Sequence, residues 1–373
     1  MISVLCVHQG VEKYGSDRSF VDAVRALEGS PELRPSVLLP GNGPILSLLK
    51  DAGQAQPTMR HLWVLRRAGI LRAITIGLPG NLLALIRAGA DLFRYQTVYV
   101  NTVVLLDFLL ASIITRKRMI VHVREIPIGI SRVWLRRLLI LSDARVLFNS
   151  KATAAAFDLP ARQPQAVVYN GFAPPPGNGK RRYSGHRPLR VLCIGRLNAW
   201  KGQDVLIDAC ARIPQSLRSR LKVRIVGGVY RRQTHFRTRL ETAVVAAGLE
   251  QTVALVDFAD DPGKEYTNAD VVVVPSIRPE PFGRVAVEAM AYGCAVLAAD
   301  HGGLSEIVID GKTGCLLPPG SPDAIAEALL RYCDQPYSVM QQGSAGRRRF
   351  QEHFTQAACD AALLAAFEQL VNS

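Results

Sequence analysis

Short runs of consecutive apolar residues, many of them β-branched, recur along this chain and alternate with segments of helical periodicity. A strand has this character when helices cover both faces of its sheet, which is typical of parallel α/β folds. The runs in the first half are residues 2–7, 37–39, 98–100, 119–123 and 145–148. Those in the second half are residues 189–194, 222–226, 253–256, 271–275 and 295–298. The pattern predicts an α/β protein with parallel sheets.

The alternation is interrupted at residues 173–188, where the sequence APPPGNGKRRYSGHRP is rich in proline, glycine and charge, as linkers are. A length of 373 residues also favours two domains. We expect doubly wound, Rossmann-like domains at residues 1–175 and 188–350, and a C-terminal helix within 351–373 that packs back across the domain junction. Ligands of such sheets bind at the carboxyl ends of the strands, so the two domains are expected to face a central cleft.

The chain carries a net charge of +14. A surface this basic attracts nucleic acid, acidic lipid headgroups or phosphorylated small molecules, and composition does not choose among them. The sequence lacks the aromatic stacking motifs and recognisable modules of nucleic-acid-binding proteins. We therefore expect no nucleic-acid partner, and a basic polyanion-binding protein stays open as an alternative.

The seven cysteines include no C-x-x-C pair and none lies near a spaced pair of histidines, so we expect buried free thiols in a reducing compartment and no zinc site. The N-terminal sequence MISVLCVHQG lacks the basic start and cleavage site of a signal peptide. No stretch reaches the ~18–20 uninterrupted apolar residues that span a bilayer. The expected location is the cytoplasm, either free or peripheral on the inner membrane face.

Two cations follow the strand at residues 189–194. Arg196 and Lys201 lie in a loop flanked by Gly195 and Gly202, just before a predicted helix. Glycines allow the backbone to approach a ligand, and the cations would offset the charge of a diphosphate. Two solvated surface cations would give the same pattern, so this motif alone leaves both interpretations open.

The segment PEPFGRVAVEAMAYG, residues 279–293, places Glu280 in a loop and Glu288 on the helix that follows. The free N–H groups at the start of a helix bind phosphate, and Glu288 would lie roughly 9 Å further along the axis, the distance to the far hydroxyls of a ribose. The alternative is an ordinary surface salt bridge from Glu288 to Arg284, with Glu280 as a solvated loop carboxylate.

Together these residues resemble glycosyltransferase family 4, whose members have the two-domain GT-B fold. The resemblance rests on G-R-L-x-x-x-K-G at residues 195–202, E-x7-E at 280–288 and G-G-x-x-E at 302–306, in matching order and spacing. Weaker similarities extend through the N-terminal half, at residues 14–17, 122–125, 149–150 and 170–171.

The resemblance implies that residues 1–175 bind the acceptor and residues 188–350 the nucleotide sugar. Arg196 and Lys201, beside Gly195, would hold the donor diphosphate and stabilise the leaving group. Glu288 would bind the ribose. Glu280 would contact the donor sugar at the catalytic centre.

Four further residues acquire roles from the same resemblance. The backbone N–H groups of Phe282 and Gly283 would assist Glu280, and Gly15 would lie in a loop against the donor phosphate. His122 would approach the donor sugar as a catalytic residue, although a buried, hydrogen-bonded histidine is equally consistent with the sequence. The family often has two glycines in its first loop, whereas residues 14–17 here are YGSD, with one.

The family retains the anomeric configuration of the donor. No Asp-x-Asp motif or histidine cluster suggests a metal, so the cations and a helix dipole are expected to offset the leaving-group charge without metal or cofactor. The resemblance thus implies transfer of a sugar from a UDP- or GDP-linked donor to a glycan or lipid-linked acceptor, as in the biosynthesis of cell-envelope polysaccharides. Another GT-B enzyme of the nucleotide-sugar epimerase type is an alternative, but we find no acid/base set for it.

Arginines alternate with tryptophan, leucine and isoleucine at residues 61–94 and 131–141. Basic amphipathic stretches of this kind lie in membrane interfaces beside anionic lipids. Helices that pack on a core and turn an arginine-rich face to solvent would show the same composition. The sequence leaves these two interpretations open.

Overall fold

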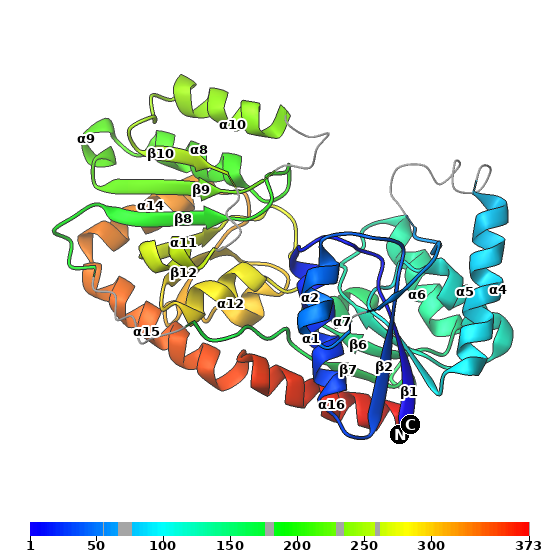
Figure 1. The fold of residues 1–373 in the computed structure, drawn as a ribbon. Coiled ribbons are helices and arrows are strands. Elements are labelled where there is room, and N and C mark those ends of the chain that lie inside the picture. Colours follow the sequence, from blue (N-terminus) through cyan, green and yellow to red (C-terminus); the bar gives the residue numbers. More distant parts are fainter. Residues whose placement is uncertain (55, 66–76, 176–182, 229–234, 258–261, 373) are drawn as a thin grey trace. The chain divides into compact units, whose positions relative to one another are not determined.

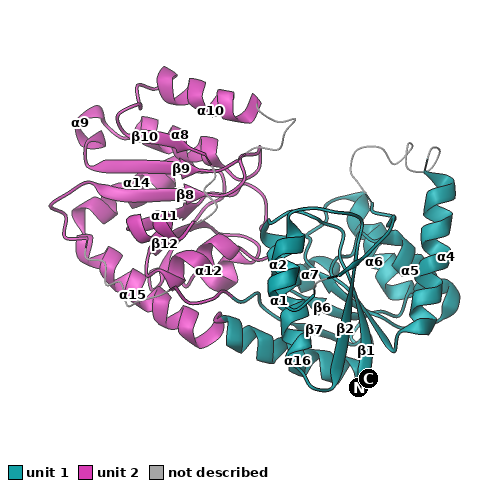
Figure 2. Ribbon diagram, in the orientation of Figure 1, with its two compact units in different colours: residues 1–171, 356–373 teal, residues 172–355 magenta. Residues whose placement is uncertain are grey.

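The computed structural model describes residues 1–373 except for residue 55, segments 66–76, 176–182, 229–234 and 258–261, and residue 373. The chain divides into two compact units, residues 1–171 with 356–373 and residues 172–355 (Figures 1 and 2). The predicted linker at 173–188 thus begins the second unit, and part of it lies outside the described residues.

Unit 1 is a seven-stranded parallel sheet in the order β3-β2-β1-β4-β5-β6-β7. Its strands are β1 (Ile2–Val7), β2 (Leu33–Leu39), β3 (Thr58–Met59), β4 (Thr97–Val100), β5 (Ile120–Val123), β6 (Arg145–Phe148) and β7 (Gln165–Val167). Its helices are α1 (Gly15–Glu28), α2 (Ile45–Asp51), α4 (Leu78–Arg94), α5 (Leu106–Thr115), α6 (Ile130–Leu141), α7 (Lys151–Phe157) and α16 (Gln356–Asn372). One core joins the sheet to α4, α5, α6 and α7, and a second joins it to α1, α2 and α16.

Unit 2 is a six-stranded parallel sheet in the order β10-β9-β8-β11-β12-β13. Its strands are β8 (Leu189–Ile194), β9 (Leu221–Val226), β10 (Val253–Val256), β11 (Val271–Val274), β12 (Ala295–Ala299) and β13 (Gly314–Leu317). Its helices are α8 (Gln203–Arg212), α9 (Gln215–Arg218), α10 (His235–Ala246), α11 (Gly263–Asn268), α12 (Arg284–Ala291), α13 (Leu304–Ile307), α14 (Pro322–Asp334) and α15 (Pro336–His353). The prediction of two doubly wound, parallel α/β sheets is confirmed.

The strands form where the apolar runs are because helices bury them on both faces. All four residues of β11 are valines, and all are buried. All seven cysteines are free and buried, as their apolar sequence contexts predicted. No helix among the described residues combines the length and apolar character needed to cross a bilayer.

The last helix returns to the first unit. Helix α15 belongs to unit 2, whereas α16 packs on α1 in unit 1. Phe367 of α16 is fully buried, and its ring centroid lies 6.4 Å from that of Tyr99 on β4. The end of the chain thus completes the core of the domain in which the chain began.

We expect Phe367→Ala to destabilise unit 1 by about 3–5 kcal/mol, because it removes a large buried side chain and leaves a cavity. The neighbouring exposed residue gives a matched control, since Glu368→Ala should change stability by less than about 0.5 kcal/mol. Amide hydrogen exchange in β4 measures the effect in unit 1 directly. Equal protection in the two variants would contradict a structural role for α16.

Candidate functional site

The loops after β8, β11 and β12 meet at the carboxyl edge of the unit 2 sheet. Glu280, after β11, forms an isolated parallel bridge with Gly302, after β12, and its carbonyl accepts the N–H of Gly303 at 2.8 Å. Gly302 has a φ of +61°, and a Cβ there would overlap the backbone of Glu280. The close backbone approach at Gly302 and Gly303 therefore joins two loops of the protein.

Lys201 is brought to the same edge by a second glycine. Gly202 has a φ of +73°, and a Cβ there would overlap the carbonyl of Pro275 at the end of β11. The loop after β8 thus packs directly on the loop after β11, and the N–H of Ile277 donates to the carbonyl of Trp200 at 2.8 Å.

Glu280 and Lys201 form one ion pair. Lys201 Nζ donates to Glu280 Oε1 at 2.6 Å, and the buried Ser276 hydroxyl donates to the same oxygen at 2.5 Å. Glu280 is only 7% exposed, so the alternative of a solvated loop carboxylate is wrong. The sequence placed Lys201 at the diphosphate and Glu280 at the sugar, whereas here the two side chains are in contact. Nothing in the sequence around Ser276 indicated its part.

Glu288 also lies in a polar cluster that is largely buried. Its Oε2 accepts a hydrogen bond from the Tyr266 hydroxyl at 2.6 Å, and its Oε1 accepts one from Arg284 Nε at 2.8 Å. Burial raises the pKa of Tyr266 well above its usual value, and the neighbouring carboxylate raises it further. The alternative pairing of Glu288 with Arg284 is therefore present, but it is not an ordinary surface salt bridge, because both side chains are mostly covered.

A carboxylate has about four lone-pair positions, so Glu288 retains acceptor capacity beyond these two bonds. Tyr266, on the six-residue helix α11, was not predicted from the sequence. Its ring stacks on that of Tyr292, with centroids 5.3 Å apart. The two rings cover one side of the Glu288 cluster.

Helix α12 begins at this edge with no side-chain cap. Gly283 is its N-cap, with a φ of +107°, and makes no side-chain hydrogen bond to the helix. Phe282 is buried, with its ring 6.2 Å from that of Phe354. The start of α12 is thus held in place by packing, and the N-terminus of a helix favours an anion.

Gly195 and Arg196 continue β8 into the loop that carries Lys201. The N–H of Gly195 donates to the carbonyl of Val226 at 3.0 Å, and Gln203 Nε2 donates to the carbonyl of Arg196 at 3.0 Å. The predicted donor-site residues of the second domain therefore share one end of this sheet: Gly195, Arg196, Lys201, Glu280, Phe282, Gly283 and Glu288.

Gly15 and His122 belong to unit 1. Gly15 is the first residue of α1, and Asp17 closes the helix start by accepting the N–H of Tyr14 at 3.0 Å. The other oxygen of Asp17 binds His8 Nε2 at 3.0 Å. Asp17 thus caps the helix that begins at the single glycine of the YGSD segment.

A buried hydrogen-bond network runs from His8 to His122. His8 Nδ1 contacts Asn101 Nδ2 at 3.1 Å, and Asn101 Oδ1 accepts from Arg124 Nε at 2.7 Å. The Tyr99 hydroxyl lies 2.7 Å from His122 Nδ1 and 3.2 Å from Asn101 Oδ1. The first turn of α1, which contains Gly15, is thereby connected to the strand that carries His122.

The network fixes the proton of His122. Arg124 Nη2 lies 3.3 Å from His122 Nδ1, and a guanidinium only donates, so Nδ1 is the acceptor and Nε2 carries the proton. His122 is 2% exposed, and its Nε2 has no hydrogen-bond partner among the described residues. Burial holds the pKa of His122 well below its ordinary value, and the positive charge of Arg124 lowers it further. His122 is thus a neutral hydrogen-bond donor, consistent with a contact to a sugar hydroxyl.

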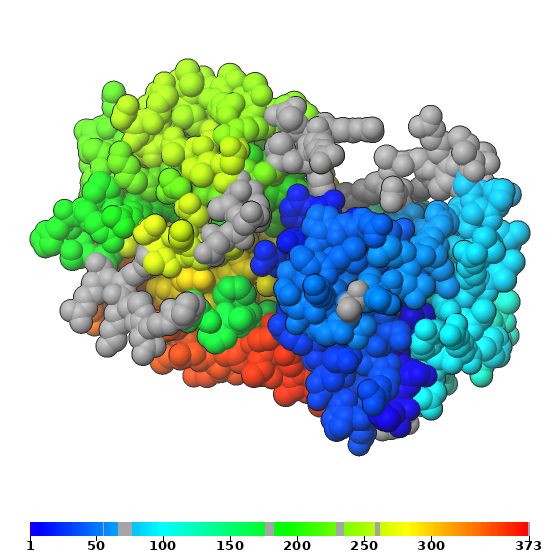
Figure 3. Space-filling model, viewed as in Figure 1, coloured from blue at the N-terminus to red at the C-terminus, as the bar shows by residue number. Residues whose placement is uncertain are grey.

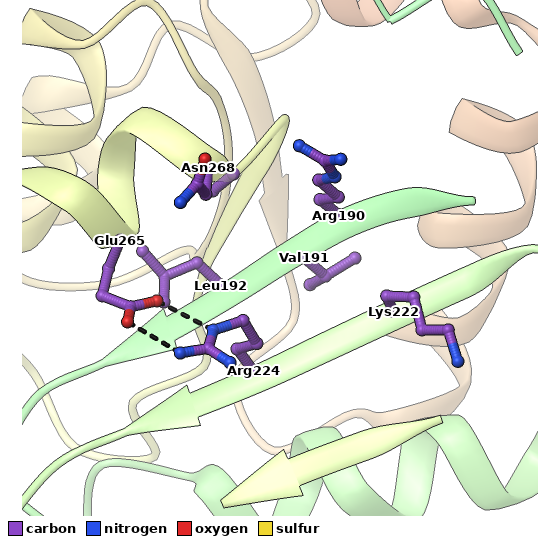
Figure 4. A pocket seen from close by; sticks show the side chains of 8 residues that line it. Arg190, Val191, Leu192, Lys222, Arg224, Glu265 and Asn268 are labelled. Carbon is purple, nitrogen blue, oxygen red and sulfur yellow. Dashed lines mark hydrogen bonds and ion pairs between the residues drawn. The ribbon is translucent and has the colours of Figure 1, made fainter. Parts of the chain in front are cut away.

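A cavity of about 460 Å³ lies elsewhere in unit 2, between β8, β9 and α11 (Figure 4). Arg190, Lys222 and Arg224 line it, and Glu265 binds Arg224 through two hydrogen bonds of 2.8 and 2.9 Å. None of the predicted donor-site residues lines it. In the described part of the chain, no three His, Cys, Asp or Glu side chains are grouped closely enough to hold a metal ion.

The neutral state of His122 makes a pH prediction for unit 1. Its folded pKa is depressed, so protons bind preferentially to the unfolded chain below the ordinary value of 6.5, and stability present above that pH is lost as the pH falls. Between pH 6 and 5, the free energy of unfolding should fall less steeply in His122→Gln than in the parent, by about 1.4 kcal/mol per pH unit. Hydrogen exchange in β5 measures this difference. The exposed His353 supplies the control, and an unchanged slope in His122→Gln would contradict a neutral His122.

Comparison with known proteins relates most of unit 2 to a family of enzymes. Residues 181–349 match the model of the family "Glycosyl transferases group 1". The amylovoran biosynthesis glycosyltransferase AmsK of Erwinia amylovora is 29% identical over 239 residues, which are 62% of this chain and 53% of that protein. The lipopolysaccharide 1,2-N-acetylglucosaminetransferase of Salmonella typhimurium is 33% identical over 204 residues, 51% of this chain and 53% of that protein. The chain thus spans about half the length of these relatives.

Solved structures extend the likeness to the whole fold. The crystal structure of Anabaena Alr3699/HepE in complex with UDP and glucose superposes with a TM-score of 0.80 at 24% identity, covering 99% of this chain and all of that one. Most of the second unit of this chain therefore matches a glycosyl transferases group 1 domain, and the chain has a GT-B fold of two Rossmann-like domains.

Proposed function

We propose that this protein is a retaining, metal-independent hexosyltransferase of glycosyltransferase family 4, which transfers a sugar from a UDP- or GDP-linked donor to a glycan or lipid-linked acceptor. The observation that carries the proposal is the pair of buried acids at one sheet edge, Glu280 held by Lys201 and Glu288 held by Tyr266, within a group 1 domain. The neighbour HepE was solved with UDP and glucose, which supports a nucleotide-sugar donor.

Glu288 is assigned to the ribose. Its hydrogen bonds to Tyr266 and Arg284 fix the carboxylate while leaving lone pairs for two hydroxyl donors. A group fixed before binding loses little conformational entropy when the ligand arrives. The same two bonds prevent Glu288 from swinging away into solvent.

Arg196, Lys201 and the uncapped start of α12 are assigned to the diphosphate. Lys201 already contacts Glu280, so it would serve the phosphate and the carboxylate together, between the diphosphate and the sugar. Positive groups that are in place before the reaction stabilise the charge that develops on a departing nucleoside diphosphate. This arrangement supplies that charge from the protein.

Glu280 and His122 are assigned to the donor sugar. Glu280 Oε1 already carries two hydrogen bonds, which lowers its strength as a nucleophile. We therefore favour displacement on one face of the sugar. The bond from C1 to the β-phosphate oxygen breaks, the acceptor oxygen bonds to C1 from the same side, and the acceptor proton passes to the departing phosphate oxygen. His122 Nε2–H would donate to a sugar hydroxyl.

The proposal extends to the acceptor side. Two relatives, the amylovoran biosynthesis glycosyltransferase AmsK and the Salmonella lipopolysaccharide transferase, support a glycan or lipid-linked acceptor in cell-envelope glycan biosynthesis. We place the protein in the cytoplasm, in peripheral contact with the anionic inner face of the membrane. A panel of UDP- and GDP-sugars would identify the donor, and turnover of none would count against the enzyme.

Glu288→Ala and Lys201→Ala should each weaken nucleotide-sugar binding at least about tenfold, or about 1.4 kcal/mol, without unfolding the protein. Glu288→Ala removes the carboxylate assigned to the ribose hydroxyls, and Lys201→Ala removes the cation assigned to the diphosphate. Calorimetric titration with the donor found by the panel measures the change. Lys222→Ala, an exposed lysine on β9, is the matched control, and unchanged affinity in either test variant would refute its assigned role.

Removal of divalent cations should leave turnover unchanged, because protein groups are assigned the whole leaving-group charge. The rate would be measured after dialysis against EDTA and again after adding back Mg²⁺ or Mn²⁺. A loss of activity that either ion restores would exclude the metal-independent mechanism.

A further inference from the structure

Helices α4, α5 and α6 form one layer on unit 1, with α5 in contact with both of the others. The inner side of α4 places Ala84, Ala88 and Leu92 in the core, and the inner side of α6 contributes Leu135 and Leu139. This packing identifies the sides of both helices that remain for solvent.

The outer side of α4 is apolar along its whole length. Leu78, Leu82, Ile86 and Phe93 lie on it, and each is more than half exposed. Residues spaced by four or seven lie on one face of a helix. In the space-filling view, α4 lies at the surface at the right, in cyan (Figure 3).

The outer side of α6 has the same character. Ile130, Trp134 and Leu141 are exposed, with Ile130 at 74% and Trp134 at 59%. We call these three residues and the four on α4 the apolar face. Monomeric soluble proteins rarely expose large apolar side chains in such groups without a binding partner.

Exposed cations outnumber exposed acids beside the apolar face. Arg87 and Arg94 on α4 and Arg132 and Arg137 on α6 are exposed. Lys117, after α5, lies 5.0 Å above the ring of Phe93. In the described segments 77–95, 106–118 and 128–143 the acids are Asp91 and Asp107, which are buried, and Asp143, which is exposed and pairs with Arg118 at 2.9 Å.

Burial therefore decides between the two interpretations of these stretches. A helix with an arginine-rich solvent face would turn its leucines and isoleucines inward, whereas α4 and α6 turn large apolar residues out on a side that also carries arginines. We propose that the apolar face docks on the surface of an anionic lipid bilayer. A surface with a clear excess of positive charge matches a uniformly negative membrane, where apolar side chains enter the interface and arginines stay with the headgroups.

Docking also bears on the acceptor. Helix α6 begins seven residues after β5, the strand that carries His122, so its apolar face starts at the strand edge to which the sugar contact is assigned. A membrane bound there would favour a lipid-linked acceptor over a free glycan. This last step rests on the proposed function, whereas docking itself does not.

The test uses the full chain and vesicle flotation. At low salt the protein should bind vesicles that contain phosphatidylglycerol and should bind those of phosphatidylcholine alone much more weakly. Ile86→Ser/Trp134→Ser should weaken binding at least about tenfold by removing buried apolar area, and Arg87→Gln/Arg137→Gln should weaken it by a similar factor that shrinks at high salt. The matched control is Val245→Ser/Tyr337→Ser, which alters exposed apolar residues of unit 2 and should bind as the parent does.

The outcomes separate this proposal from the enzymatic one. Binding of nucleotide donor by all variants should stay unchanged, so loss of vesicle binding with intact donor binding isolates the apolar face. Failure to bind anionic vesicles at low salt, or equal binding by the Ile86/Trp134 variant, would overturn the proposal. Sedimentation as a dimer that the same variant disrupts, without vesicle binding, would assign the face to a second copy of the chain and would overturn it too.

Discussion

The site in unit 2 depends on direct backbone contact between loops that leave neighbouring strands. Gly202 lets the loop after β8 reach the carbonyl of Pro275, and Gly302 lets the loop after β12 reach the backbone of Glu280. A side chain at either glycine would overlap those atoms and would also have to adopt a left-handed backbone. The parallel sheet brings the strand ends together, but these contacts bring Lys201 within hydrogen-bond distance of Glu280.

Both carboxylates at this edge are compensated before a ligand arrives. An acid as little exposed as Glu280 would be costly to bury alone, and Lys201 with the Ser276 hydroxyl offsets that cost. Glu288 is held in the same way by Tyr266 and Arg284. The side chains are thereby fixed in one arrangement, and fixed polar groups are what electrostatic stabilisation of a developing charge requires.

The sequence predicted the parts of this arrangement that lie close together along the chain. Strand runs, the helix start at Gly283 and the spacing from Glu280 to Glu288 are local, and the structure has them where they were expected. Tyr266 was missed because it meets Glu288 from a six-residue helix that precedes β11, and nothing in the local sequence pairs them. Ser276 was missed for a related reason, since a serine near a strand end is ordinary in loops.

The apolar face shows a different limit of sequence reasoning. Helices α4 and α6 are apolar on both sides, so periodicity alone does not say which side packs on the sheet. On α4 the side that faces the core carries the small residues Ala84 and Ala88, which let the helix lie close to its neighbours. Leu82 and Ile86 remain outside. The structure, and not the periodicity of the sequence, therefore assigns the apolar residues of α4 to its inner and outer sides.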